Sequence, residues 1–156
     1  MAIKITLQLG YEFEVKAKSQ AVFDLLSDVP QSASYFPKVD RLVDLEAGGY
    51  RWEMEKIGIG QFTLQTVYAS RYTADRKQGR IAWTPIEGEG NASVSGNWQI
   101  TSRNRSTQVR LSIEAVLRLP FPALTRPIVA PLVSAEFEKL VEQYIDNLVQ
   151  QFGGEV

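Results

Sequence analysis

The sequence predicts an α+β protein in which a curved antiparallel sheet of about seven strands wraps around one long C-terminal helix, with two short helices after the first strand. Residues 3–15 alternate between apolar and polar side chains, and alternating segments recur through the middle of the chain. From about residue 131 to residue 152, the apolar period changes from 2 to 3.6. A chain of 156 residues is expected to form one domain, residues 1–156.

The first strand and the two short helices follow from local pattern. Every odd residue from 3 to 15 is apolar, which is typical of a half-buried strand. Ser19 is expected to cap the first helix, and Pro30 is expected to stop it. A second helical turn is expected near residues 32–35, ending at Pro37.

The middle of the chain predicts a series of further strands. Turn signals such as Ala47-Gly48-Gly49 and the pair Gly58 and Gly60 separate the alternating segments. Successive strands joined by turns indicate an antiparallel meander with one dry face and one wet face. The strands are predicted over residues 39–45, 50–56, 62–72, 80–86, 92–100 and 109–117.

The stretch WTPIEGEGNASVSGNW, residues 83–98, raises the question of a nucleotide-binding loop. A dinucleotide fingerprint needs glycine at its first, third and sixth places before a helix. Gly88 and Gly90 fit, but the sixth place is Ser93 and an alternating strand follows. We therefore predict a hairpin turn over residues 88–91, and a bend of the sheet at Gly96.

The C-terminal segment predicts one long amphipathic helix over residues 131–152, ended by Gly153-Gly154. The preceding segment, residues 119–131, is apolar and holds four prolines, so we expect an extended or kinked chain there. Only this helix is long enough to cover the concave face of the sheet. The sheet and the helix would then enclose a space.

Composition excludes several classes of function. Lys and Arg number 17 against 18 Asp and Glu, with no basic run, so no nucleic acid partner is expected. The chain has no cysteine and no histidine, which excludes thiolate nucleophiles, Ser-His-Asp hydrolysis and His- or Cys-based metal sites. No catalytic residue, cofactor or metal is predicted. Without a signal peptide or an apolar run that spans a membrane, we expect a cytoplasmic protein.

Three segments, taken in order, resemble a known superfamily. They are FEVKAKSQAVFDLLSDVPQSASYFP near the start, GNWQI followed by TQVRLSIEAVL, and the final amphipathic helix. Together they resemble the helix-grip (SRPBCC) superfamily, which includes START lipid-transfer domains, Bet v 1-like allergens and, nearest to this chain, bacterial polyketide cyclase/dehydrase-like proteins. The resemblance implies a hydrophobic cavity between the sheet and the last helix. Across the superfamily this cavity holds sterols, phospholipids, polyketides and plant hormones.

The candidate ligand-binding residues are those expected to face inward from the strands and the last helix. Tyr and Trp are favoured in such a wall because they combine apolar area with one polar group that orients a ligand. Hydroxyl groups on the same face either hold the polar head of a ligand or bond to the backbone or a buried water. The set comprises Trp52, Met54, Leu64, Thr66, Tyr68, Ser70, Trp83, Trp98, Leu111, Ile113, Phe137, Val141 and Tyr144.

Three functions remain open from the sequence. The favoured one is binding or transport of a small hydrophobic or amphipathic ligand, such as a lipid, an isoprenoid or a polyketide-like molecule. The alternatives are a polyketide cyclase/dehydratase-type enzyme, in which a residue such as Tyr68 or an inward carboxylate would move protons, although no inward carboxylate is evident, and a protein-interaction module with an unknown partner. No stable membrane insertion is expected. Residues 119–131 would lie at the cavity mouth, as a gate, as a transient membrane contact or as a plain connector.

Overall fold

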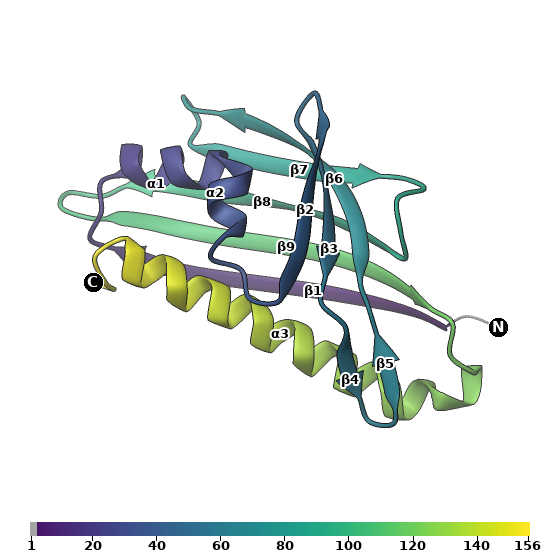
Figure 1. The fold of residues 1–156 in the computed structure, drawn as a ribbon. Helices are drawn as coiled ribbons and strands as arrows, with labels where there is room; N and C mark the ends of the chain where they lie inside the picture. Colours follow the sequence, from purple (N-terminus) through teal and green to yellow (C-terminus); the bar gives the residue numbers. More distant parts are fainter. Residues whose placement is uncertain (1–2) are drawn as a thin grey trace.

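A seven-stranded antiparallel sheet curves around the long helix α3 (Arg126–Gln151) in the computed structural model, which describes residues 3–156 (Figure 1). The predicted fold class is confirmed. The strand order is β1-β9-β8-β7-β6-β3-β2, and β4 and β5 form a separate two-stranded sheet. The other elements, in chain order, are β1 (Ile3–Val15), α1 (Ser19–Ser27), α2 (Val29–Ala33), β2 (Val39–Glu46), β3 (Gly49–Met54), β4 (Ile57–Ile59), β5 (Phe62–Leu64), β6 (Val67–Asp75), β7 (Arg80–Ile86), β8 (Ala92–Ser102), β9 (Thr107–Leu119) and the 3-10 helix η1 (Ala123–Thr125).

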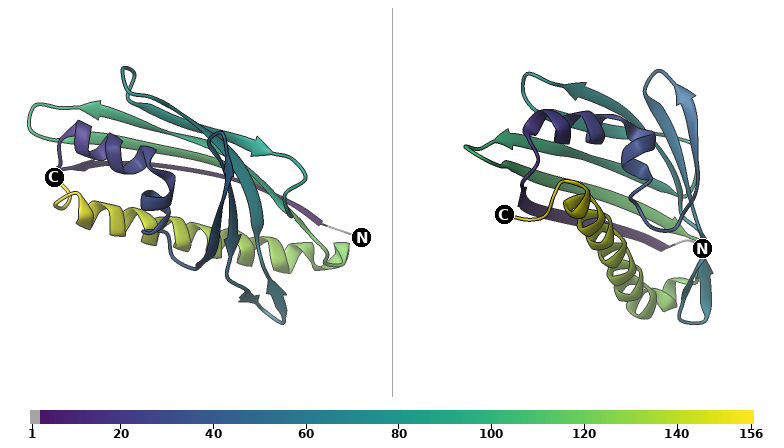
Figure 2. Two further views of the ribbon diagram at one scale, coloured as in Figure 1. Left: turned by 45° about the horizontal axis from the view of Figure 1, so that its top comes forward. Right: turned by 60° about the vertical axis from the view of Figure 1, so that its left-hand side comes forward.

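The two longest strands, β1 and β9, pair without interruption from Ile3 opposite Leu119 to Val15 opposite Thr107. Their alternating pattern buries one face of each strand, as a sheet with one covered face requires. Helix α3 runs along that face in the hollow of the curved sheet, and α1 and α2 lie over the same hollow beside the C-terminal half of α3 (Figures 1 and 2). The apolar stripe of α3 is therefore buried against the sheet.

Three apolar clusters fill the hollow. The first joins α1 and the C-terminal half of α3 to the strands β7, β8 and β9. The second joins the start of α3 to the β4–β5 hairpin and to the opposite end of β1 and β9. The third packs α2 against β3. The space between these clusters is the place where a cavity can form.

The short helices differ from the prediction in where they begin and end. Helix α1 starts at Ser19 itself, with Lys18 as the N-cap residue, so Ser19 makes no capping hydrogen bond. Asp28 instead caps α2, because its side chain accepts the Gln31 N–H at 3.2 Å. Pro30 lies in the first turn of α2, where a missing N–H removes no helical hydrogen bond. Pro30 thus belongs to the start of the second helix.

The single strand predicted over residues 62–72 is two strands. The chain leaves the main sheet after β3 as the β4–β5 hairpin, passes Gln65 and Thr66, and rejoins the sheet as β6. The hairpin packs on the segment before α3, with the Phe62 and Phe121 rings stacked at a centroid distance of 4.6 Å. The apolar–polar alternation of the sequence continues through Gln65 and Thr66, but packing of the hairpin against α3 interrupts the strand there.

Helix α3 begins five residues earlier than predicted, at Arg126, and contains Pro131. Residues 119–131 are therefore the end of β9, a 3-10 turn and the first helical turns, and they do not form an extended loop. Pro127 lies in the first turn of α3. Pro131 has no N–H to donate to the Pro127 carbonyl, but Pro127 is exposed, so water can bond to that carbonyl instead. No helix within residues 3–156 is both long and apolar enough to cross a membrane.

Candidate ligand-binding cavity

A cavity of about 80 Å³ lies between the concave face of the sheet, α2 and α3. One water molecule needs at least about 10–15 Å³, so the cavity has room for several water-sized groups. Its wall consists mainly of aliphatic and aromatic side chains, as is usual for small-molecule sites.

Most of the residues proposed from the sequence lie around this cavity. The alternation of the strands points them to one face, and the curvature of the sheet then turns that face towards α3. All three tryptophans of the chain are among them. The residues brought together in this way are Trp52, Met54, Tyr68, Trp83, Trp98, Leu111, Ile113, Phe137, Val141 and Tyr144.

The other three proposed residues do not line the cavity. Leu64 is 2% exposed and packs in the cluster at the start of α3. Thr66 lies at the break between β5 and β6, where its carbonyl accepts the Met54 N–H at 3.0 Å. Ser70 is fully buried and donates its hydroxyl to the Val94 carbonyl of β8 at 2.8 Å. The hydroxyl of Ser70 bonds to the backbone, which was the alternative to a ligand contact.

Sequence reasoning missed about half of the wall. Leu7, Leu9, Tyr72 and Ala115 share the inward parity of their strands, so the alternation alone would have found them. The residues from the short helices had no comparable signal, because nothing local shows which helix covers the open end of a sheet. The missed wall residues are Leu7, Leu9, Leu26, Val29, Ser32, Phe36, Tyr72, Val94 and Ala115.

Two pairs of polar side chains in the wall satisfy each other. The hydroxyls of Ser32 on α2 and Tyr144 on α3 are hydrogen-bonded, although 112 positions separate them in the sequence. The Trp52 indole N–H donates to the Tyr72 hydroxyl at 3.0 Å. These bonds tie α2 to α3 and β3 to β6 across the wall, so the polar groups also hold the shape of the cavity.

The Tyr68 hydroxyl has no such partner among residues 3–156. Its ring stacks on Trp52, with centroids 5.8 Å apart and planes 11° from parallel. Within the described residues, no fully buried side-chain nitrogen or oxygen lacks a hydrogen bond. The unpaired Tyr68 oxygen must therefore border accessible space, and Tyr68 is part of the cavity wall. It is a donor and an acceptor that a bound molecule can use.

The cavity tyrosines, Tyr68, Tyr72 and Tyr144, are held in the neutral form. Burial raises the pKa of Tyr68 well above its ordinary value, and the nearby phenols of the other two raise it further. Burial also raises the pKa of Tyr72 and of Tyr144, and the hydrogen bonds from Trp52 and Ser32 offset this only in part. The wall residues within 3–156 include no Asp, Glu, Lys or Arg. The cavity thus offers neutral hydrogen-bonding groups and no formal charge.

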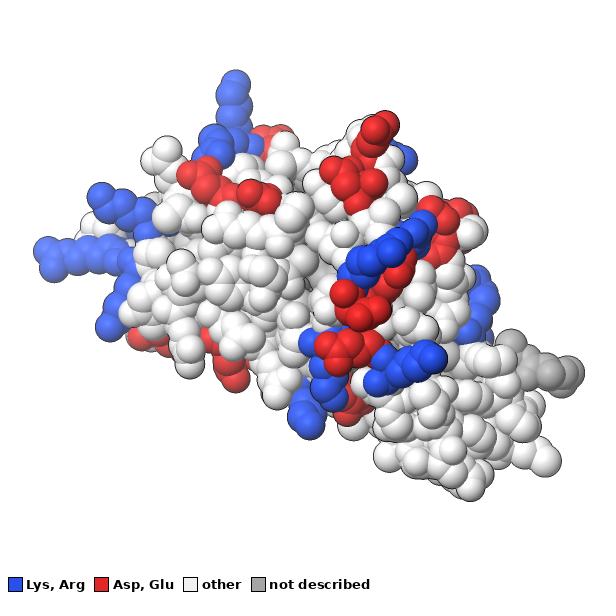
Figure 3. All heavy atoms as spheres, in the orientation of Figure 1, with Lys and Arg blue, Asp and Glu red and all other residues white. Residues whose placement is uncertain are grey.

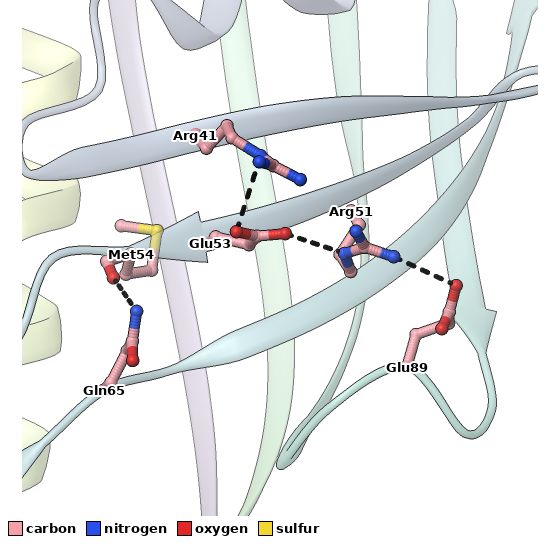
Figure 4. Close-up of polar contacts among 6 residues, drawn as sticks. All are labelled: Arg41, Arg51, Glu53, Met54, Gln65 and Glu89. Atoms are coloured by element: carbon pink, nitrogen blue, oxygen red, sulfur yellow. Dashed lines mark hydrogen bonds and ion pairs between the residues drawn. The ribbon is translucent and has the colours of Figure 1, made fainter.

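Charged groups lie on the opposite, outer face of the sheet (Figure 4). Arg51 on β3 contacts Glu53 at 2.9 Å and Glu89 at 3.6 Å, and Arg41 on β2 contacts Glu53 at 3.6 Å. This row connects two strands to the turn between β7 and β8. Glu53 and Glu89 are therefore in ion pairs, away from the cavity.

A curved antiparallel sheet, a long helix in its hollow and an apolar cavity between them define a helix-grip domain with an internal cavity. The family described as "Polyketide cyclase / dehydrase and lipid transport" matches residues 6–153. The chain belongs to this family.

Solved structures show the same fold at low sequence identity. The Zhui aromatase/cyclase from Streptomyces sp. R1128 has a TM-score of 0.69 and 15% identity, covering 95% of this chain and 94% of that one. A START superfamily protein from Mycobacterium smegmatis has a TM-score of 0.64 and 17% identity, covering 92% and 97%. The major latex-like protein 151 of Panax ginseng has a TM-score of 0.59 and 12% identity, covering 95% and 98%. A comparison with curated proteins gives no match.

Proposed function

We propose that this protein binds, and by releasing it transports, a small uncharged molecule that is mainly apolar and carries one hydrogen-bonding group. A single observation carries the proposal, namely the Tyr68 hydroxyl, which has no hydrogen-bond partner within residues 3–156 and lies in a mainly apolar wall without formal charge. A polar group in such a place is stabilised when a ligand bonds to it. The ligand classes that fit are lipids, isoprenoids and polyketide-like molecules with a hydroxyl or a carbonyl.

The size of the cavity limits the part of the ligand that enters without rearrangement. A volume of about 80 Å³ suits a ring or a short chain. A longer ligand needs the space that the cluster of β4, β5 and the start of α3 now fills, including Leu64 and Val133. Binding of a long chain is therefore expected to move the β4–β5 hairpin away from α3.

The absence of charge in the wall predicts a preference among ligands of equal length. A carboxylate would lose its hydration without gaining a cation, whereas an alcohol or a ketone would lose much less. We expect a fatty alcohol to bind at least about tenfold more tightly than the fatty acid with the same chain at pH 8, a difference of about 1.4 kcal/mol. The three wall tryptophans report binding directly through their fluorescence.

Native mass spectrometry of gently purified protein and tryptophan quenching with lipids and isoprenoids test the proposal. Saturable quenching by uncharged ligands, together with a co-purifying mass, supports it. The variant Tyr68→Phe should weaken binding of the alcohol about five- to tenfold, because one hydrogen bond contributes about 1 kcal/mol. The matched variant Tyr35→Phe, outside the wall, should leave it unchanged. If no ligand quenches saturably and none co-purifies, the proposal is wrong.

A polyketide cyclase/dehydratase-type enzyme is the second candidate, and the same hydroxyl favours it. Because burial raises the pKa of Tyr68, the phenol stays protonated near neutral pH, so it can donate a hydrogen bond to a carbonyl oxygen but is not available as a base. In an enzyme, Tyr68→Phe should abolish turnover of a polyketide-like substrate and leave its affinity nearly unchanged. Equal loss of turnover and affinity would instead indicate a binding role.

A location in the cytoplasm is part of the same proposal. It depends on the sequence pattern and is tested by fractionating cells that produce the full-length protein.

A further inference from the structure

Within residues 3–156, three of the four large apolar side chains that are strongly exposed lie together at one end of the molecule. Leu124 is 94% exposed, Ile128 68% and Leu132 42%, and they follow one another at intervals of four residues from η1 into α3. This spacing places them on one side of the helix. Soluble proteins rarely leave such side chains grouped in the open without a partner.

The β4–β5 hairpin extends the same surface. A groove of about 340 Å³ lies between the hairpin tip at Gly60 to Phe62 and the side chains of Ile128 and Leu132. Figure 3 shows this end, at the lower right of the view, without Lys, Arg, Asp or Glu atoms on the face that it presents. We call Leu124, Ile128, Leu132 and residues 60–62 the apolar tip.

The segments that form the apolar tip carry one charge, and it is positive; the nearest carboxylates along the chain, Glu55 and Glu136, lie just outside these segments, and Glu136 contacts Lys38 at 3.4 Å. Residues 57–66 and 119–135 together contain one charged residue, Arg126, which is exposed. On the outer face of the sheet at the same end, Lys4 on β1 lies directly opposite Arg118 on β9, and both are exposed. Within residues 3–156 neither forms an ion pair. Like charges opposite each other destabilise a sheet unless an anion lies between or beside them.

We propose that the apolar tip docks on a lipid bilayer that carries anionic headgroups. The exposed apolar side chains would enter the boundary between headgroups and acyl chains, as those of interfacial helices do. Arg126, Lys4 and Arg118 would face the negative surface. The tip adjoins the cluster that closes one end of the cavity, so docking there places the closed end of the cavity against the membrane.

The distribution of charge at the apolar tip argues against a second copy of the chain as the partner. A two-fold interface brings the same patch of each subunit together, so Arg126 would meet Arg126 with no acidic residue of the tip to pair with. Stable interfaces also use about 20–30 residues on each side, more than the tip offers. A bilayer requires neither a matching acidic patch nor a large rigid surface.

Co-sedimentation of the full-length protein with vesicles tests this inference. We expect binding to phosphatidylcholine vesicles that contain phosphatidylglycerol, weaker binding to phosphatidylcholine alone, and weakening by salt. The double variant L124S/I128S should bind at least about tenfold more weakly, because burial of either side chain is worth more than a factor of ten. Val156→Ser, which removes an apolar side chain that is 67% exposed at the other end, is the matched control.

A second pair of variants separates the charges from the apolar contact. K4Q/R118Q should lose the preference for phosphatidylglycerol, and R103Q/R105Q, which removes two charges at the β8–β9 turn, should keep it. Equal binding by L124S/I128S and the wild-type protein overturns the inference, as does no binding to either vesicle. It is also overturned if sedimentation equilibrium shows a dimer that L124S/I128S converts to a monomer. Quenching by the fatty alcohol without vesicles should be the same in all four variants, so this result is independent of the cavity proposal.

Discussion

Replacing Asn91 by alanine should destabilise the fold substantially, although Asn91 lies in a turn between β7 and β8. Its side-chain oxygen accepts the Val67 N–H at 2.9 Å, and its amide donates to the Gln65 carbonyl at 2.8 Å. These two bonds close the gap in the backbone pairing where the chain passes from β5 to β6. The Asn91 N–H also donates to the Val67 carbonyl at 3.0 Å, so the turn docks on this gap at three points.

The magnitude follows from the two groups that lose their partner. A buried donor or acceptor left without a hydrogen bond costs about 1–3 kcal/mol. Gln65, Val67 and Asn91 are only half-buried, so water can reach part of the gap. We therefore expect Asn91→Ala to lower the free energy of unfolding by about 2–4 kcal/mol, with a fall in Tm of about 2–4 °C for each kcal/mol in a domain of this size.

Urea unfolding followed by tryptophan fluorescence and by far-ultraviolet circular dichroism measures this change. Asn97→Ala is the matched control, because Asn97 is half-buried on β8 and makes no side-chain hydrogen bond within residues 3–156. The reasoning is refuted if Asn91→Ala and Asn97→Ala differ by less than about 0.5 kcal/mol, the usual effect of a surface substitution. A changed m-value would mean that the two-state comparison does not hold.

Three further predictions follow from the cavity wall, the bend of the sheet and the outer ion pairs. Burial raises the pKa of the cavity tyrosines, so they stay protonated in the folded state, whereas the same tyrosines ionise near pH 10 in the unfolded chain. The free energy of unfolding should therefore not depend on them below about pH 9, and should fall by up to about 4 kcal/mol per pH unit above pH 10. Urea titrations that show no fall at alkaline pH would contradict the burial of these tyrosines. Gly96→Ala should lower the free energy of unfolding by at least about 1–3 kcal/mol, because a Cβ atom there would lie 2.3 Å from the Ser112 carbonyl oxygen and 2.6 Å from the Trp83 ring. In the control Gly10→Ala, the new Cβ atom would have no other atom within 4 Å, so stability should be nearly unchanged. Similar urea midpoints for the two variants would rule out the close packing at Gly96. Glu53→Gln should lower the free energy of unfolding by less than about 1 kcal/mol, and by less still in high salt, because its two arginine partners are partly solvated. A loss above about 2 kcal/mol would show that these ion pairs are stronger than a surface network.

Strand alternation explains why much of the cavity wall was predictable. A period of two is a local property, and it places Trp52, Trp83 and Trp98 on one face whatever the rest of the chain does. The order of the elements then leaves only α3 to cover that face. The same reasoning failed at Ser70, which has the inward parity of Tyr68 and Tyr72 but bonds to the β8 backbone. Parity gives the face of a residue and does not give what lies above it.

The prolines near the helix ends show a second limit of prediction from local sequence pattern. Pro30 was interpreted as the end of the first helix. In the structure, Asp28 is both the last cap of α1 and the first cap of α2, and Pro30 lies in the first turn of α2. Pro131 was interpreted as the start of α3 but lies within it. A proline is acceptable in a first turn and is also tolerated where its carbonyl partner faces water, so its position alone does not distinguish these cases.

The sequence by itself determined the α+β class, the strands, the long amphipathic helix and the face from which a cavity would be lined, because each depends on a periodicity within about ten to twenty residues. Only the tertiary structure decided that the wall includes Ser32 and Phe36, that the Ser32 and Tyr144 hydroxyls pair across 112 positions, and that Tyr68 remains unpaired. Hydrogen bonds and cavities depend on distances between segments that are remote in the chain. Those distances are set by how the whole sheet curves around α3, and no local pattern encodes them.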